Sequence, residues 1–290
     1  MKRILVTGAT GNIGMEVIHF LSQNNADNKI IAAVRNIEKG KKTLAAYPQL
    51  DYVGFDFEDP GTFNEALQNV DCLFLLRPPH IANVDKFFKP LIQKVKEEGV
   101  KEIVFLSVQG AERSSVIPHN KIEKLIKENN LDYIFLRPSY FMQNLTTTLL
   151  DDIKEKQKII LPSGKAKFNW IDGKNIGEVA AQVIHDFENF KNQAFEVTGH
   201  ENRDFYEVSD LIRKITGKEV RYQSVNPIRF FRIKKKDGLK QGMIFVMIML
   251  HFLPRFQKAP RISDFYEKIT AKKPATLKQF IEREKEKFSN

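Results

Sequence analysis

Short runs of apolar and β-branched residues recur along the chain, and the segments between them repeat apolar residues every three to four positions. Each run has the length and composition of a buried β-strand. The intervening segments have helical spacing, as Ile13, Val17 and Leu21 show in the first of them. The runs that we interpret as strands are residues 3–7, 29–34, 51–56, 71–76, 102–107, 132–138 and 193–199. This alternation predicts an α/β protein with a doubly wound parallel sheet, in which ligands bind at the carboxyl ends of the strands.

The first predicted strand leads into the sequence TGATGNIG, which has glycines at positions 8, 11 and 14. Glycines at a strand-to-helix turn let backbone amides approach a pyrophosphate, and the helix adds the positive end of its dipole. A glycine-rich turn without a ligand is the alternative, but the strand, loop and helix context favours a Rossmann-type dinucleotide site. The residues expected to contact the cofactor here are Gly8, Thr10, Gly11, Asn12, Ile13 and Gly14.

The end of the second predicted strand indicates which dinucleotide binds. NAD-specific proteins of this type carry Asp or Glu about 20 residues past the glycine loop, where it binds the ribose hydroxyls. Arg35 occupies that position here, and Lys39, Lys41 and Lys42 follow it. A guanidinium binds a 2′-phosphate through two parallel hydrogen bonds, so NADP is favoured over NAD. Asp56, at the end of the third strand, is expected to contact the adenine, or else serves as a turn acid.

The pattern changes after Gly199. A helix expected over 176–187 precedes the last strand of the sheet, and residues 204–225 then have the pattern of a helix followed by a short strand. We therefore predict that 1–150 and 172–199 form an NAD(P)-binding Rossmann domain. Residues 151–171 and 200–290 are predicted to form a small α+β substrate-binding region.

The net charge of +10 is unevenly distributed: residues 1–200 hold 25 basic and 25 acidic side chains, and residues 201–290 hold 21 and 11. The densest basic run is RFFRIKKKDGLK, Arg229 to Lys240. It is interpreted as a solvated helix face, with binding of phosphates or an anionic membrane surface as the alternative. No nucleic-acid partner is expected. The apolar segment 242–253 is too short for a transmembrane span, which needs ~20 apolar residues, and is expected to be buried or to line a pocket.

Cys72 is the single cysteine, so the chain forms no internal disulfide, and a reducing compartment is expected. The N-terminus enters a strand at once and leaves no room for the apolar region of a signal peptide. These features predict a cytoplasmic protein without a transmembrane segment.

Several segments together resemble the NmrA-like branch of the atypical short-chain dehydrogenases/reductases, and the resemblance covers nearly the whole chain. TGxxGxxG alone occurs in many dinucleotide proteins, whereas RPSYFMQN (137–144) and IDGKNIGEVAA (171–181) are more specific. The resemblance implies either NAD(P)H-dependent reduction of quinones, azo compounds or triphenylmethane dyes, or redox sensing without turnover. Arg77, in LLRPP, and Pro138, in RPSYFMQN, are expected to contact the cofactor on the same ground.

The sequence departs from ordinary short-chain dehydrogenases at their catalytic Tyr-x-x-x-Lys motif. If Lys121 is the lysine, the tyrosine position holds Ile117. The usual proton relay is therefore absent, which argues against sugar epimerisation and against alcohol oxidation by the ordinary mechanism. Reduction of a quinone-like acceptor remains compatible, because the stabilised anion that forms takes its proton from water.

Several polar residues are still expected near the nicotinamide. Lys121 resembles the active-site lysine of the isoflavone-reductase branch and is expected to bind the nicotinamide ribose or stabilise negative charge, unless it is a solvated lysine. Ser107 ends the fifth strand, where the parent family keeps a catalytic serine, or it simply caps that strand. His119 is a candidate proton donor or a helix-entry residue. Tyr140 is an alternative donor that also contacts cofactor and substrate, or it packs in the core, and Asn144 is expected to orient either group.

The apolar segment 242–253 supplies Met243, Phe245 and Met247, which are expected to line the acceptor pocket; the alternative is that they form the core of the small region. No metal site is expected, and both a monomer and a homodimer stay open. Two functions stay open as well: an NADPH-dependent oxidoreductase of a flat apolar acceptor, and a non-catalytic NAD(P)-sensing regulator. A third is a dinucleotide-binding protein that associates with a membrane surface through 229–240 and the following apolar helix.

Overall fold

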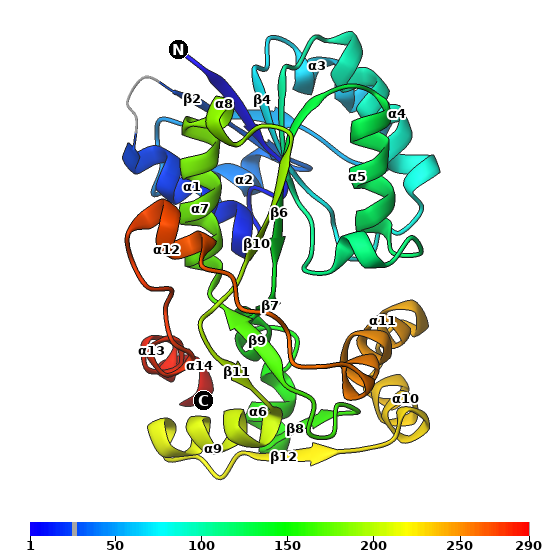
Figure 1. Ribbon diagram of the computed structural model, residues 1–290, viewed down its shortest axis with the longest axis vertical. Coiled ribbons are helices and arrows are strands. Elements are labelled where there is room, and N and C mark those ends of the chain that lie inside the picture. Colours follow the sequence, from blue (N-terminus) through cyan, green and yellow to red (C-terminus); the bar gives the residue numbers. More distant parts are fainter. Residues whose placement is uncertain (25–27, 290) are drawn as a thin grey trace. The chain divides into compact units, whose positions relative to one another are not determined.

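Seven parallel strands form the main sheet of the computed structural model, which describes residues 1–24 and 28–289 (Figure 1). Their order is β10-β6-β5-β4-β1-β2-β3, so the strand order reverses beside β1. The doubly wound parallel sheet predicted from the sequence is therefore confirmed. The strands are β1 (Arg3–Val6), β2 (Lys29–Val34), β3 (Asp51–Gly54), β4 (Cys72–Leu76), β5 (Glu102–Leu106), β6 (Asp132–Pro138) and β10 (Gln193–Val197).

Helices cover both faces of this sheet. Figure 1 shows α4 (Val84–Glu97) and α5 (Pro118–Glu128) on one face, and α1 (Asn12–Asn24) and α7 (Gly173–His185) on the other. A Cβ on Gly177 would lie 2.6 Å from the backbone carbon of Glu16, so only glycine permits the close approach of α7 to α1. The first unit also contains shorter helices: α2 (Ile37–Thr43), η1 (Pro60–Thr62), α3 (Phe63–Leu67), η2 (Ala111–Arg113), α8 (Phe187–Phe190) and α12 (Phe265–Thr270).

The chain divides into two compact units, and each is described by itself. The first comprises Met1–Pro138, Gly173–Val197 and Phe265–Lys272, and the second comprises Ser139–Asp172, Thr198–Asp264 and Lys273–Asn290. These bounds differ from the predicted domains mainly at 139–150 and 265–272, and by one or two residues at 172 and at 198–199. Residues 139–150 belong to the second unit because Tyr140 pairs with Trp170 in a parallel ladder. The segment 265–272 returns to the first unit, where the Phe265 ring stacks on Phe195 at 4.1 Å.

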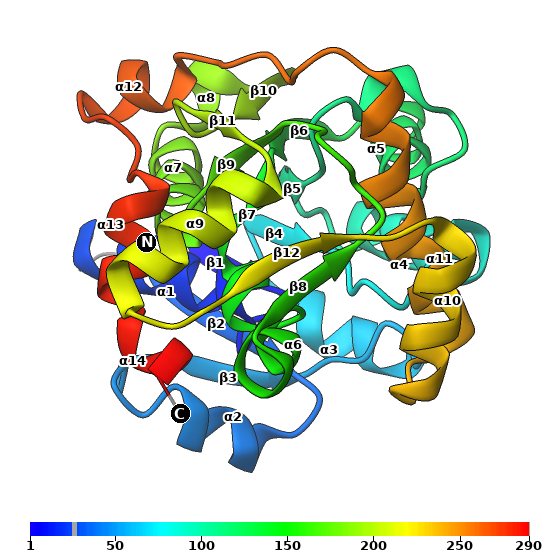
Figure 2. The same ribbon diagram turned by 90° about the horizontal axis from the view of Figure 1, so that it is seen from below.

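The second unit contains two small sheets. One has the order β11-β9-β7, and in the other β8 and β12 lie side by side in parallel (Figure 2). Their strands are β7 (Tyr140–Phe141), β8 (Lys158–Leu161), β9 (Phe168–Ile171), β11 (Asn202–Arg203) and β12 (Arg221–Ser224). The helices are η3 (Met142–Thr146), α6 (Leu150–Lys156), α9 (Phe205–Thr216), α10 (Pro227–Lys236), α11 (Gln241–Phe252), η4 (Leu253–Phe256), α13 (Leu277–Arg283) and α14 (Lys285–Ser289).

Helix α11 is only half buried, whereas the sequence predicted a segment that is buried or lines a pocket. Ile244, Met247 and His251 are buried in the second unit. On the opposite side, Phe245 and Met249 are each 57% exposed. The physical reason is that α10 and the core of the unit contact α11 from one side. Among the described residues, no helix is long and apolar enough to cross a membrane.

Candidate functional site

The glycine loop joins β1 to α1 in the first unit. Gly8 has a φ of +63°, a left-handed conformation that favours glycine. A Cβ on Gly14 would lie 2.1 Å from the Gly8 carbonyl oxygen, so glycine is required where α1 crosses the loop. Gly11 donates its amide to the same oxygen over 2.9 Å and is itself exposed. The geometry therefore separates a structural glycine, Gly14, from an exposed one, Gly11.

The beginning of α1 suits an anionic ligand. Its first turn contains no acidic residue, and Thr10, Gly11 and Asn12 are exposed there while Ile13 is buried. A helix N-terminus presents unpaired backbone amides and partial positive charge. Thr7 fixes this end of the sheet, because its hydroxyl donates to the Phe74 carbonyl (3.1 Å) and accepts from the Leu76 amide (2.8 Å). These residues fit a pyrophosphate.

Arg35 directly follows β2, and its side chain is exposed. The next residue, Asn36, caps α2 by accepting the Lys39 amide at 2.8 Å, and this cap fixes the backbone beside Arg35. Lys41 and Lys42 lie in the last turn of α2. The cations expected to bind a 2′-phosphate thus lie at the end of β2 and on the following helix α2, and the side chain of Arg35 is exposed to solvent.

Asp56 lies two residues beyond β3 and is half-buried. One of its carboxylate oxygens accepts the Glu58 amide at 3.0 Å, and its own amide donates to the Thr62 hydroxyl at 3.1 Å. These contacts are those of a turn acid. The contact with adenine stays a prediction.

Arg77 and His119 form a hydrogen-bonded pair beyond β4. The guanidinium donates from Nη1 to the carbonyls of Pro78 (2.9 Å), Pro79 (3.2 Å) and Ile81 (2.6 Å), and from Nε to His119 Nε2 (3.3 Å). Burial lowers the pKa of Arg77 to about 10, so it stays protonated at neutral pH. Its donors are thus used to hold the loop, and its predicted contact with the cofactor stays a prediction.

His119 has the geometry of an acceptor. Burial and the charge of Arg77 together lower the pKa of His119 to about 3, so the imidazole is neutral at physiological pH. Nε2 accepts from Arg77, which places the ring proton on Nδ1. This arrangement argues against His119 as the proton donor.

Ser107 belongs to a buried polar network that the sequence analysis missed. Its hydroxyl donates to Glu123 at 2.6 Å, and Arg137 binds the same carboxylate through Nε (3.0 Å) and Nη2 (2.6 Å). Glu123 is 3% exposed. Glu123 is on α5, and Arg137 directly precedes Pro138, whose carbonyl accepts the Gln109 amide at 2.9 Å. Ser107 therefore contributes to packing of α5 against β5 and β6, and a catalytic role stays a prediction.

Lys121 is in the first part of α5 and is exposed. Within the described parts of the chain, no carboxylate forms an ion pair with its ammonium group. Ile117 occupies the N-cap position of the same helix. Lys121 is therefore the candidate catalytic residue of the first unit whose charge remains available to a ligand.

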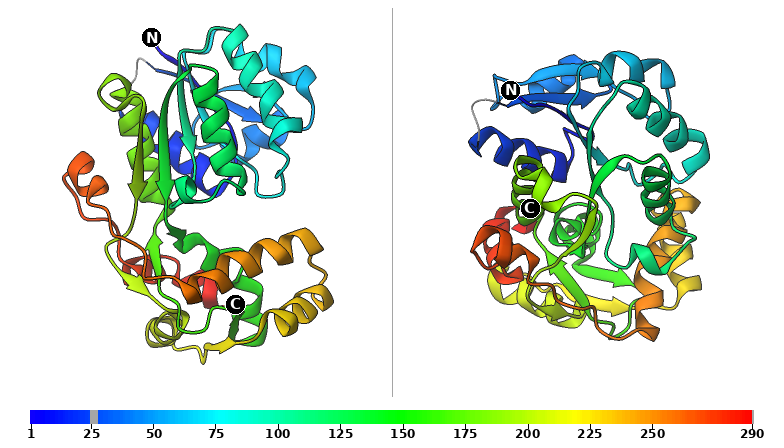
Figure 3. Two further views of the ribbon diagram at one scale, coloured as in Figure 1. Left: turned by 45° about the vertical axis from the view of Figure 1, so that its right-hand side comes forward. Right: turned by 45° about the horizontal axis from the view of Figure 1, so that its top comes forward.

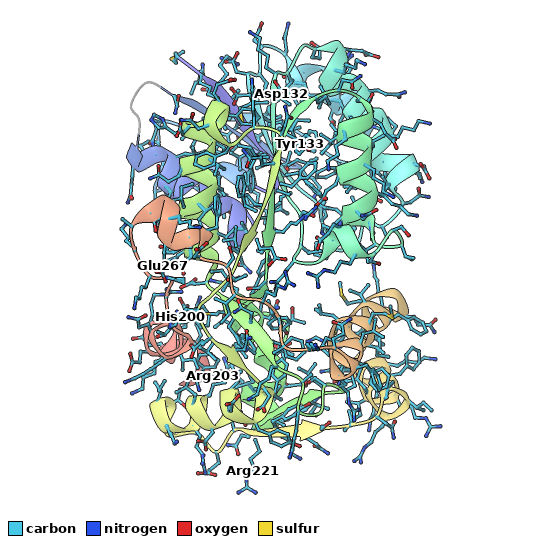
Figure 4. The ribbon with its side chains drawn as sticks, in the orientation of Figure 1. Asp132, Tyr133, His200, Arg203, Arg221 and Glu267 are labelled. Carbon is cyan, nitrogen blue, oxygen red and sulfur yellow. The ribbon has the colours of Figure 1, made fainter. Side chains whose placement is uncertain are left out.

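Tyr140 belongs to the aromatic core of the second unit. Its ring packs edge-on against Trp170 (4.8 Å between centroids, 76° between the ring planes), and Trp170 donates its indole N–H to the carbonyl of Arg203, which is labelled in Figure 4. The Tyr140 hydroxyl lies 2.9 Å from His251 Nε2, while His251 Nδ1 lies 2.7 Å from the Met247 carbonyl. Because the Met247 carbonyl can only accept, the ring proton lies on Nδ1, which donates to it, and the Tyr140 hydroxyl donates to Nε2.

The Tyr140–His251 pair is electrically neutral. Burial lowers the pKa of His251 to about 4. Burial also raises the pKa of Tyr140, and the Asn144 side chain opposes that shift by hydrogen bonding. Asn144 thus lies beside Tyr140, within η3, and its role in orienting a reacting group stays a prediction. His251 was not among the predicted site residues, although it is the single polar residue in the apolar segment 242–253.

The three substrate candidates on α11 are divided between its two sides. Met247 is buried, and Met243 packs against the same hydrophobic cluster. Phe245 lies on the exposed side. Met243 and Met247 thus pack in the core of the second unit, which was the alternative expectation, and their lining of the acceptor pocket stays a prediction.

The sheet, the glycine loop and the exposed cation after β2 define a dinucleotide-binding α/β protein. More specifically, the chain belongs to the NmrA-like family, which matches residues 1–276. The resemblance stated from the sequence is therefore confirmed.

Relatives and solved structures extend over almost the whole chain. The Prestalk A differentiation protein A of Dictyostelium discoideum is 31% identical over 287 residues, covering 99% of this chain and 93% of the relative. The NAD(P)H azoreductase of Xenophilus azovorans is 28% identical and covers 96% of each chain. The NADPH complex of an NADPH-dependent quinone oxidoreductase from Escherichia coli has a TM-score of 0.85 at 23% identity, covering 97% of this chain and 99% of that one. Triphenylmethane reductase from Citrobacter sp. has the same score and identity, with coverage of 99% and 100%. The two structural likenesses show the fold.

Proposed function

We propose that this protein is an NADPH-dependent oxidoreductase that transfers a hydride to a flat, apolar acceptor such as a quinone, an azo compound or a triphenylmethane dye. The observation that carries the proposal is the exposed glycine loop at an acid-free helix N-terminus, followed by the exposed side chain of Arg35. Similarity to a named NAD(P)H azoreductase, at 28% identity, supports the reaction class. The buried, free thiol of Cys72 suits a reducing, cytoplasmic environment.

The glycine loop, Arg35 and Lys121 have different roles in the proposed reaction. Bound NADPH supplies the hydride. Backbone amides after Gly8 bind the pyrophosphate, and Arg35 binds the 2′-phosphate. The ammonium of Lys121 stabilises the negative charge that develops on the acceptor oxygen or nitrogen. With a quinone or an azo compound the anion then takes one proton from water, so that acceptor, NADPH and one proton become reduced acceptor and NADP⁺. A cationic triphenylmethane dye accepts the hydride at its central carbon, so that dye and NADPH become the neutral leuco dye and NADP⁺ without a proton.

A screen of NADPH oxidation over quinones, azo dyes, triphenylmethane dyes and simple aldehydes tests the proposal. We expect acceptor-dependent loss of NADPH absorbance with at least one of the first three classes. Lys121→Met removes the charge while keeping much of the side-chain length, and is expected to lower kcat with little change in NADPH affinity. NADPH binding without oxidation across the whole screen would refute the enzymatic proposal.

A regulator that senses NAD(P) is the second candidate. It is favoured by Ile117 at the tyrosine position and by the acceptor state of His119. The relative at 31% identity, whose name describes differentiation and no reaction, also favours it. Tight NADPH binding together with absent turnover in the same screen is the result that selects this candidate.

The cofactor preference has its own test. Loss of a charge-assisted hydrogen bond costs about 1.5–3 kcal/mol, so Arg35→Ala is expected to weaken NADPH binding about ten-fold or more and to leave NADH binding nearly unchanged. Fluorescence titration of both cofactors measures the ratio. Equal affinities for NADPH and NADH in the unmutated protein would contradict the assignment of Arg35.

A further inference from the structure

Helices α10 and α11 of the second unit lie side by side (Figure 3). Their outer faces have different chemistry. The rings of Phe231 and Phe245, 5.4 Å apart between centroids, join the two helices along one edge. We call the outer faces of both helices, together with η4, the α10–α11 patch. The patch is independent of the residues assigned to NADPH.

The α11 side of the patch is apolar. Exposed side chains recur there at the spacing of one helical face, and the face continues into η4. Phe245 and Met249 are each 57% exposed, and Phe256 is 75% exposed. The members of this face are Phe245, Val246, Met249, Leu250, Leu253 and Phe256. Contiguous exposed apolar surface of this kind marks an interaction site more often than isolated residues do.

The α10 side of the patch is basic. Its exposed positions also have helical spacing and carry Arg229, Arg232, Lys235 and Lys236. Between residues 226 and 262 the sequence has nine basic residues and one acidic residue, Asp237. The Asp237 carboxylate accepts from Lys156 at 2.8 Å, so it is already neutralised by a residue outside the patch. Cations therefore border an uncovered apolar face.

We propose that the α10–α11 patch docks onto an anionic phospholipid surface, with the apolar face of α11 at the level of the acyl chains and the cations of α10 among the head groups. Basic residues beside apolar side chains are typical of helices that lie in the membrane interface. Helix α11 has 12 residues, which at 1.5 Å per residue span about 18 Å, so it lies on the membrane and does not cross it.

Other occupants fit the patch less well. A second copy of the chain would place two strongly basic surfaces against one another, which costs energy through like-charge repulsion. A nucleic acid would satisfy the cations but would leave the apolar face of α11 in water. An anionic bilayer is the partner that satisfies both halves.

Vesicle sedimentation tests the proposal without any acceptor present. We expect binding to vesicles of phosphatidylcholine with phosphatidylglycerol, little binding to phosphatidylcholine alone, and release at high salt. Each basic residue near an anionic membrane contributes about 1 kcal/mol, or about five-fold. Arg229→Glu with Arg232→Glu is therefore expected to lower the partition coefficient at least about 25-fold. Phe245→Ser with Met249→Ser is expected to lower it about ten-fold or more, because both side chains leave the acyl region.

The charge variant has a closely matched control on α4. Lys86 and Lys89 occupy the same positions relative to the N-cap Asn83 as Arg229 and Arg232 do relative to the N-cap Asn226. Both lysines are exposed. Lys86→Glu with Lys89→Glu changes the net charge equally and is expected to leave vesicle binding within about two-fold of the unmutated protein, because neither lysine belongs to the α10–α11 patch.

Further measurements keep each outcome decisive. Trp170, the single tryptophan, is buried in the second unit, so its fluorescence reports whether a variant keeps that unit folded. If a glutamate variant unfolds, Arg229→Gln with Arg232→Gln replaces it. Equal binding to neutral vesicles, or equal loss in the α4 control, overturns the proposal. The proposal is also overturned if Phe245→Ser with Met249→Ser keeps vesicle binding but changes KM for an acceptor, or if it converts a dimer into a monomer.

Discussion

Gly11 and Gly14 of the cofactor loop are expected to respond differently to an added side chain. At Gly14 a Cβ would lie 2.1 Å from the Gly8 carbonyl oxygen and 2.9 Å from the Ala9 Cα, both backbone atoms that cannot rotate away. Overpacking of this kind costs about 1–3 kcal/mol, and the backbone contact places Gly14→Ala at the upper end. At Gly11 the Gly8 carbonyl oxygen, 3.2 Å away, is the single atom that a Cβ would meet within 4 Å. Gly11→Val is therefore expected to change stability by about 1 kcal/mol or less.

Binding and stability measured on the same variants separate the two roles. Gly11→Val is expected to abolish binding of NADPH and NADH in calorimetry, because its methyl groups stand where backbone must approach the pyrophosphate. Its melting temperature should stay close to that of the unmutated protein. Gly14→Ala is expected to lower the melting temperature by several degrees. Normal NADPH binding by Gly11→Val, or an unchanged melting temperature for Gly14→Ala, would refute this account of the loop.

Three further predictions concern the second unit. Met247→Leu, a volume-conserving change that costs under about 1.5 kcal/mol of stability, is expected to shift KM among quinone and dye acceptors with NADPH affinity unchanged. An unchanged acceptor preference would show that Met247 only packs in the core. Burial lowers the pKa of His251 to about 4, so the unfolded chain binds more protons than the folded one between pH 4 and about 6.5. The free energy of unfolding is therefore expected to fall as the pH drops through that window, and a His251→Gln variant with the same acid sensitivity in urea titrations would contradict this. Lys234 and Asp152 form an ion pair with both side chains almost fully buried, and Lys234→Met is expected to cost about 3–5 kcal/mol, although Lys156 still contacts Asp152; denaturant midpoints measure that loss, and an unchanged midpoint would show the pair to be unimportant.

The main sheet could be predicted because its strands are buried on both faces. Ile4, Leu5 and Val6 are fully buried on consecutive positions, so β1 reads as a continuous apolar run. The boundary after Pro138 could not be predicted in the same way. It depends on the pairing of Tyr140 with Trp170, a contact between residues 30 positions apart that leaves no local change in composition.

The candidate site likewise has features that the local sequence predicts and features that depend on contacts between distant parts of the chain. The glycine loop and Arg35 follow from local spacing, because a phosphate site at a strand-to-helix turn uses consecutive residues. The partners of the polar side chains do not. Tyr140 and His251 are 111 positions apart, and only the isolation of His251 in an apolar segment gave a signal.

The hydrogen bonds of the polar candidates narrow the chemistry that the proposed enzyme performs. His119 accepts from Arg77, and Ser107 donates to Glu123. Burial raises the pKa of Tyr140, which makes its hydroxyl a weaker acid. A hydride added to an aldehyde gives a strongly basic alkoxide that needs a positioned acid, whereas a reduced quinone spreads its charge over the ring and accepts a proton from water. We therefore expect quinone reduction and no measurable reduction of simple aldehydes at equal concentrations. Comparable kcat/KM for the two classes would show that one of these side chains does donate a proton.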